Sequence, residues 1–156
     1  MSKIFIDTNL FVYSLDKKDK QKQKKASKIL KTIVDSHQPV ISTQVIKEFY
    51  VVATQKLNAD KIIIKNIIHN FHKMEIVNND LGLIEQAVDI SILSQLSFWD
   101  ALIIVAAEKA NCEFVFSEDL NSGQTYRGVV VLNPFVQNFS SRESGVKSNS
   151  RGQQLS

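Results

Sequence analysis

Residues 3–9 read KIFIDTN, a short apolar run that is closed by an acid and two small polar residues. The aromatic and β-branched residues of KIFI favour a β-strand, and the DTN that follows suits a turn or the start of a helix. This segment therefore predicts a first strand over residues 3–6, followed by a short helix.

Strand and helix signals continue to alternate along the rest of the chain. We expect helices over residues 19–36, 60–73, 81–96 and 97–111, and one more that is capped by Ser42 or Thr43 and carries Val45, Phe49 and Val52. Strands are predicted at Val40 and Ile41 and over residues 75–77, 114–116 and 129–132. Such alternation predicts an α/β fold: a central parallel sheet with right-handed crossovers and helices on both faces.

Composition limits the number of domains. A chain of 156 residues with 44% hydrophobic and 22% charged residues is ordinary for one globular domain. From residue 140 onward only Val146 and Leu155 are apolar, so that segment cannot offset its ordering entropy. We predict a single domain over residues 1–139 and a disordered polar C-terminal tail over residues 140–156.

Targeting signals are not apparent in the sequence. The apolar run at the N-terminus stops at Asp7, too early for a signal peptide. No apolar segment approaches the roughly 20 residues that a membrane helix requires. The single cysteine, Cys112, cannot form an internal disulfide. We therefore expect a cytoplasmic protein without a membrane partner.

A basic stretch lies within the predicted helix over residues 19–36 and just before it. Between Lys17 and Lys31 there are eight lysines and one acid, Asp19, although the net charge of the chain is only +3. The lysines that recur at helical spacing, and would share one face, are Lys17, Lys20, Lys24, Lys28 and Lys31. This face is either a solvated helix surface or a surface that guides RNA phosphates.

Four acids are placed where an α/β sheet gathers functional groups. Asp7 and Asp119 follow predicted strands, and Glu48 and Asp100 lie on helices that begin shortly after connections from the same sheet. Functional groups in such sheets collect beyond the carboxyl ends of the strands. Carboxylates held close together raise one another's pKa unless cations neutralise them. Oxygen ligands alone select Mg²⁺ or Mn²⁺ over zinc.

Each acid also has an ordinary structural explanation. Asp7 can cap the following helix. Ser97 and Asp100 match the spacing of a capping box. Glu48 lies among apolar residues and needs a partner or a solvated side, and Asp119 suits an Asx-turn. The hypothesis of a metal site therefore depends on the four acids as a set.

The segments around these acids resemble one family. IDTNLFVY, the glutamate of VIKEFY, SFWDALI, and VFSEDLNSGQ followed by VVVLNPF resemble PIN-domain proteins, in particular VapC-like toxins. VapC-like toxins are the ribonuclease half of bacterial type II toxin-antitoxin pairs, and the resemblance spans residues 3–135. It implies a Rossmann-like PIN fold. The implied site residues are the metal-binding catalytic acids Asp7, Glu48, Asp100 and Asp119, the Ser117 hydroxyl that supports the last acid, and the polar neighbours Asn9 and Asn121.

The resemblance also implies an activity. It points to a Mg²⁺- or Mn²⁺-dependent endoribonuclease that hydrolyses phosphodiester bonds, assembles as a homodimer and is bound by a cognate antitoxin. Two alternatives stay open. An aspartyl-phosphate hydrolase would want a second acid two residues after Asp7, where this sequence has Asn9. A PIN-like domain can also act as a non-catalytic binding module.

Overall fold

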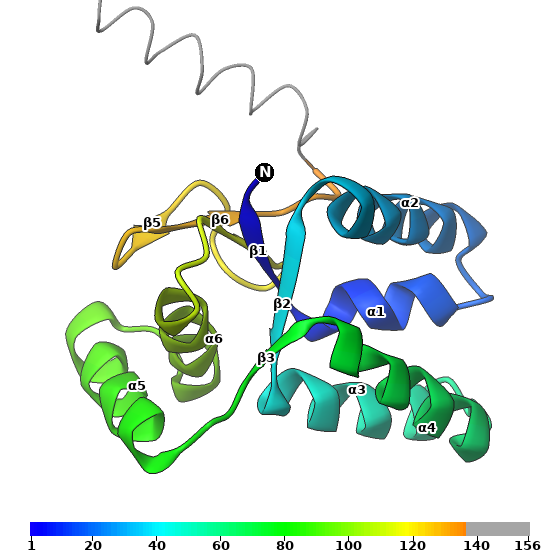
Figure 1. Cartoon of the computed structure of the whole chain (residues 1–156), viewed down its shortest axis with the longest axis horizontal. Helices are drawn as coiled ribbons and strands as arrows, with labels where there is room; N and C mark the ends of the chain where they lie inside the picture. Colours follow the sequence, from blue (N-terminus) through cyan, green and yellow to red (C-terminus); the bar gives the residue numbers. More distant parts are fainter. Residues whose placement is uncertain (137–156) are drawn as a thin grey trace, which may run out of the picture.

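The computed structural model describes residues 1–136, which form a six-stranded sheet with six α-helices (Figure 1). The strands are β1 (Lys3–Ile6), β2 (Gln38–Ser42), β3 (Glu75–Val77), β4 (Phe114–Phe116), β5 (Thr125–Tyr126) and β6 (Val129–Leu132). The helices are α1 (Thr8–Leu15), α2 (Lys20–Ser36), α3 (Thr43–Gln55), α4 (Lys61–Asn70), α5 (Leu81–Ser94) and α6 (Phe98–Lys109), with a 3₁₀ turn, η1 (Phe71–Lys73), after α4. The predicted domain end at residue 139 and the predicted tail lie outside the described residues.

The sheet has the order β3-β2-β1-β4-β6-β5. All neighbouring strands are parallel except β5, which is antiparallel to β6. At the centre, Phe5 of β1 is in register with Val40 of β2 and Val115 of β4, and all three are fully buried. The predicted α/β fold with a mostly parallel sheet is confirmed, and β5 is an additional strand that the sequence pattern does not predict.

Helices cover both faces of the sheet. Figure 1 shows α1, α2, α3 and α4 on one side of strand β2, and α5 and α6 on the other. Most of α6 is buried, which matches its nearly uninterrupted apolar sequence. Within residues 1–136 no single helix has the length and apolar character to cross a membrane. Among these described residues, α5 and α6 reach that length and composition only when taken together, and they are bent by 118° where they join.

Three aromatic rings pack helices α1 and α3 and the 3₁₀ turn η1 against one another. The rings of Phe11 on α1, Phe49 on α3 and Phe71 in η1 contact one another, with centroids 5.1 to 6.1 Å apart. All three side chains are buried. Edge-to-face and tilted rings at this spacing pack favourably. The cluster therefore fixes α1 against α3, and with them the residues at their N-terminal ends.

Candidate active site

Asp7 lies at the carboxyl end of the central strand β1 and caps helix α1. Its Oδ1 accepts a hydrogen bond of 2.7 Å from the Thr8 amide, and its Oδ2 accepts one of 2.7 Å from the Ser117 hydroxyl. Burial raises the pKa of Asp7 to about 6; the two hydrogen bonds oppose this shift, and the charges of Glu48 and Asp119 add to it. Asp7 therefore caps α1, as predicted. It is also a buried acid whose raised pKa means that it loses its proton less readily than an ordinary aspartate.

Asp119 is held in the loop that follows β4. The Ser117 hydroxyl oxygen accepts hydrogen bonds from the amides of Asp119, at 3.2 Å, and Leu120, at 3.4 Å. The Asn9 side chain donates to Asp119 Oδ2 at 3.0 Å. Burial raises the pKa of Asp119, and the carboxylates of Glu118, Asp100 and Glu48 raise it further. Ser117 therefore organises both Asp7 and the loop of Asp119.

Glu48 is positioned on α3 by two neighbouring side chains. The Thr8 hydroxyl donates to Glu48 Oε2 at 2.8 Å, and Gln44 Nε2 donates to Oε1 at 3.0 Å. Gln44 is one helical turn before Glu48, so the two share a face of α3. The same Gln44 nitrogen also donates to the carbonyl oxygen of Trp99, at the start of α6, at 3.4 Å. Thr8 and Gln44 were not among the predicted site residues.

Asp100 lies in the first turn of α6. Its backbone amide donates to the Ser97 hydroxyl oxygen at 3.1 Å, which makes Ser97 the N-cap of this helix. Within residues 1–136 the return bond of a capping box, from the Ser97 amide to the Asp100 carboxylate, is not formed. The Asp100 carboxylate instead acts on Asp119, whose pKa it raises. Capping therefore explains Ser97 and leaves the Asp100 side chain unexplained.

Three of the four acids line one cleft of about 750 Å³. The polar and charged residues that line it are Asp7, Thr8, Asn9, Gln44, Lys47, Glu48, Asn79 and Asp119. Its apolar wall consists of Val51, Val52, Ile84, Phe98, Trp99 and Leu102. Asp100 is not a lining residue, although its neighbour Trp99 is. Asn121 is exposed and lies outside the lining, where its carbonyl oxygen accepts a hydrogen bond from the Gln124 amide.

Comparison with known families places this cleft in a known fold. A sequence model of the PIN domain matches residues 4–127. The chain belongs to the PIN domain family. The resemblance in the sequence is thus confirmed, and the match to this PIN domain extends from β1 to the turn after β5. The comparison with curated protein sequences gives no match.

Solved structures similar to this PIN domain include toxins and their complexes. VapC20 of Mycobacterium tuberculosis, a toxin that cleaves the sarcin-ricin loop, is 19% identical with a TM-score of 0.60, covering 74% of this chain and 91% of that chain. A toxin-antitoxin complex from Klebsiella pneumoniae is 19% identical with a TM-score of 0.61, covering 81% and 95%. VapBC2 of Rickettsia felis, bound to promoter DNA, is 15% identical with a TM-score of 0.58, covering 83% and 96%. At these identities the similarity shows the fold.

Three of the four candidate acids of this PIN domain accept hydrogen bonds from protein donors. Among residues 1–136, no three His, Cys, Asp or Glu side chains are grouped closely enough to hold a metal ion as they stand. Asp7, Glu48 and Asp119 each accept hydrogen bonds from neighbouring side chains. The charges that act on the pKa of Asp7 and Asp119 all come from other carboxylates. An oxygen-rich, negatively charged cleft of this kind offers the oxygen ligands that a hard divalent cation prefers.

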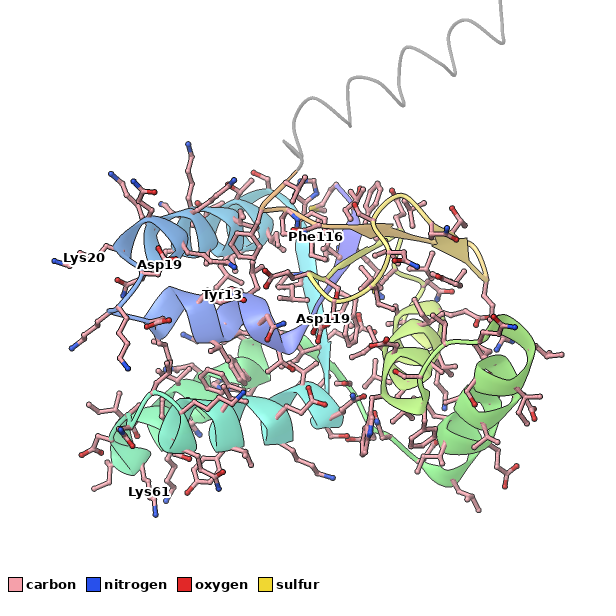
Figure 2. The ribbon with its side chains drawn as sticks, turned by 180° about the vertical axis from the view of Figure 1, so that it is seen from behind. Tyr13, Asp19, Lys20, Lys61, Phe116 and Asp119 are labelled. Carbon is pink, nitrogen blue, oxygen red and sulfur yellow. The ribbon has the colours of Figure 1, made fainter. Side chains whose placement is uncertain are left out.

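The predicted lysine face is exposed along α2. Four of its members, Lys20, Lys24, Lys28 and Lys31, lie on α2, whereas Lys17 lies in the connection before α2 and does not share the helix face that was predicted for it. All five are exposed, and Lys31 is 3.5 Å from Asp35. Figure 2 shows Asp19 and Lys20 at the end of α2 that lies away from Asp119. The face therefore begins at the far end of α2 from the cleft and runs back toward the sheet.

Lys22 lies apart from this face and contacts the loop of Asp119. Its Nζ is 2.9 Å from Glu118 Oε1 and 3.9 Å from the centroid of the Tyr13 ring. The hydrogen bond to Glu118 raises the pKa of Lys22. The Tyr13 ring also packs edge-on against Phe135, with centroids 5.3 Å apart. Lys22 thereby anchors the residue next to Asp119 to helices α1 and α2.

Proposed function

We propose that this PIN domain is a Mg²⁺- or Mn²⁺-dependent endoribonuclease in which Asp7, Glu48, Asp100 and Asp119 are the catalytic acids and hold the ion. The observation that carries the proposal is the electrostatic coupling of these acids. Glu48 and Asp119 raise the pKa of Asp7, and Glu48 and Asp100 raise that of Asp119. A divalent cation removes such repulsion, and the oxygen-only donor set suits Mg²⁺ or Mn²⁺.

Binding of an ion requires changes in side-chain direction. Glu48 has to release at least one of its bonds to Thr8 and Gln44, and Asp119 its bond to Asn9. Asp7 needs less movement because β1, Thr8 and Ser117 already fix its carboxylate. We therefore assign Asp7 as the anchor of the site, with Glu48 and Asp119 turning toward it.

The proposed reaction is hydrolysis of an RNA phosphodiester bond. A divalent ion would supply activation of water at neutral pH and would offset the charge that builds on the phosphate. The residues of the chain orient and position: the acids hold the ion, Asn9 and Ser117 hold Asp119 and Asp7, and Lys47 in the cleft attracts the phosphate. The lysine face on α2 guides the RNA strand, over the roughly 10 Å range that salt screening allows at 0.1 M.

We further propose that the chain is the toxin of a toxin-antitoxin pair, bound by a cognate antitoxin and assembled as a homodimer. Support comes from the similar structures, two of which are described as a toxin-antitoxin complex and as VapBC2 bound to promoter DNA. These two proteins are 19% and 15% identical to this chain, so they share its fold. The proposal of an antitoxin partner and a homodimer rests on that shared fold.

Expression of the chain without any partner tests the proposal in cells. We expect growth arrest with new RNA 5′ ends from the chain as it stands, and neither from Asp7→Asn. Asp89→Asn is the matched control, because Asp89 is an exposed acid on α5 outside the cleft. Arrest by Asp7→Asn with the same RNA ends would contradict the proposed role. Expression without arrest or RNA cleavage would favour a non-catalytic binding module.

A further inference from the structure

The cleft has an apolar wall whose most exposed member is an aromatic ring. Trp99 is 62% exposed, although the cleft that it lines also contains the buried Asp7. Its ring packs against Phe98 in a T-shaped arrangement, with centroids 5.5 Å apart and an interplanar angle of 62°. A large aromatic surface is thus left open to solvent in the same cleft as the acids.

Unpartnered oxygens lie beside this wall. Gln44 is only 7% exposed, and its Oε1 has no hydrogen-bond partner among the described residues. Its amide cannot be reversed, because Nε2 faces two acceptors, the Glu48 carboxylate and the Trp99 carbonyl oxygen. The Oδ1 of Asn79, another residue of the cleft, is also buried without a partner among residues 1–136. Buried acceptors of this kind suit a ligand with N–H groups.

We propose that Trp99 is a stacking platform for an unpaired RNA base, next to the phosphate that lies at the acids. The inference rests on the proposed function and names the part of the substrate that the apolar wall binds. A base offers a flat ring for Trp99 and N–H groups along its edge. Bases in an RNA duplex are stacked on one another, so a single strand is required.

The apolar wall could also receive an apolar segment of a protein. Continuity with the acids favours the base, because Asp7, Glu48 and Asp119 line the same cleft as Trp99. Lys47 in that cleft supplies positive charge suited to the phosphate between two bases. A purely apolar side chain would leave the oxygen of Gln44 unpartnered.

Trp99 is the only tryptophan of the chain, so its fluorescence reports directly on the proposed contact. The full chain is titrated in EDTA, which prevents metal-dependent cleavage, with a single-stranded RNA of six adenosines. Two further probes are an RNA duplex long enough to stay fully paired and inorganic polyphosphate of charge similar to that of the single strand. We expect quenching by the single strand alone. Binding of the single strand without quenching, or equal quenching by polyphosphate, would overturn the proposal.

Variants give a second readout through the anisotropy of labelled RNA. Trp99→Ala should weaken single-strand binding by about 5- to 150-fold, the range for one base stacked on an aromatic ring, and Trp99→Phe should retain most of the affinity. Leu93→Ala is the control, because Leu93 is 83% exposed on α5 and does not line the cleft. An unchanged affinity of Trp99→Ala for the single strand would overturn the proposal and would favour a protein segment as the ligand of the apolar wall.

The two proposals can fail separately. If single-stranded RNA quenches Trp99 but the chain does not cleave RNA in Mn²⁺, the stacking proposal stands and the ribonuclease proposal fails. If the unmodified chain cleaves RNA, and Trp99→Ala has the same RNA affinity and KM, the ribonuclease proposal stands and the stacking proposal fails. Circular dichroism of Trp99→Ala checks that the variant is folded, and the exposure of the side chain predicts that it is.

Discussion

The Ser117 hydroxyl donates a hydrogen bond of 2.7 Å to Asp7, across 110 positions of sequence. This bond joins the residues that follow β1 and β4, two neighbouring parallel strands. Because the Ser117 oxygen also accepts from the amides of Asp119 and Leu120, one side chain holds the Asp7 carboxylate and the backbone of the loop that carries Asp119. The candidate site is therefore built on the central strands of the sheet.

The buried Asp7 should make metal-free stability depend on pH. Its pKa is about 6 in the fold, against an ordinary 3.8, so between these values the folded state binds more protons than the unfolded state. The free energy of unfolding therefore falls as pH rises from about 4 to 6, by about 3 kcal/mol for this group. Urea unfolding in EDTA at pH 4 and pH 7 measures the difference.

Asp7→Asn is the control for this titration. Other carboxylates also titrate in this range, and the difference between the two proteins isolates Asp7. The variant should lose most of the predicted decline and be at least as stable as the unmodified chain at pH 7. A decline of the same size in both proteins would show that Asp7 is not the titrating group.

Asp100 and Ser97 should separate catalysis from helix capping. Ser97→Ala removes the N-cap of α6 and should lower the free energy of unfolding by about 1 kcal/mol while RNA cleavage persists. Asp100→Asn should abolish Mn²⁺-dependent cleavage and change stability by less than about 1 kcal/mol, since its carboxylate makes no capping bond. Thermal unfolding and cleavage rates measure both effects. If Asp100→Asn instead lowered the free energy of unfolding by about 1 kcal/mol and left RNA cleavage unchanged, Asp100 would be a capping residue only.

Removal of the Lys22 charge should loosen the loop that carries Asp119. Lys22→Met keeps most of the side-chain length, and it breaks the 2.9 Å ion pair with Glu118. We expect a loss of about 1 kcal/mol in stability and a clear fall in kcat, because Glu118 is next to Asp119 in the chain. Lys18→Met is the control, since Lys18 is exposed in the connection between α1 and α2. Equal kcat in the two variants would argue against the anchoring role.

The lysine face on α2 should contribute to RNA binding through charge alone. Reversal of Lys24 and Lys28 to glutamate should weaken binding and reduce the slope of log Kd against log salt, by about 0.7 for each RNA phosphate that the protein no longer neutralises. The matched control reverses Lys61 and Lys65, which have the same spacing on α4. If both double variants change the slope equally, the effect reflects net charge, and the face on α2 has no special role.

Much of the fold could be predicted because its strands and helices have strong local patterns. β5 was missed because two residues carry too little pattern, and its hairpin turn is unusual. Arg127 and Gly128 both have positive φ, 49° and 83°, between the paired residues Tyr126 and Val129. Such turns normally have Asn or Asp where this chain has arginine. The sequence signal that marks a tight hairpin was therefore absent.

The candidate site was predictable only in part. Asp7 and Asp119 follow strands, so topology alone places them at one edge of the sheet. Gln44, Trp99 and Lys47 enter the cleft because α3 and α6 approach each other there, and no local pattern reports such an approach. Asn121 is exposed and does not line the cleft, and its predicted place beside the acids stays a prediction.

The central claim is that this cleft cleaves RNA with the help of a divalent ion. Its most direct test is cleavage of a single-stranded RNA by the purified chain in Mn²⁺ and in EDTA, beside Asp7→Asn at equal concentration. We predict discrete products with Mn²⁺ from the unmodified chain only, and intact RNA in the other reactions. Cleavage that persists in EDTA, or that Asp7→Asn performs equally well, would contradict the account.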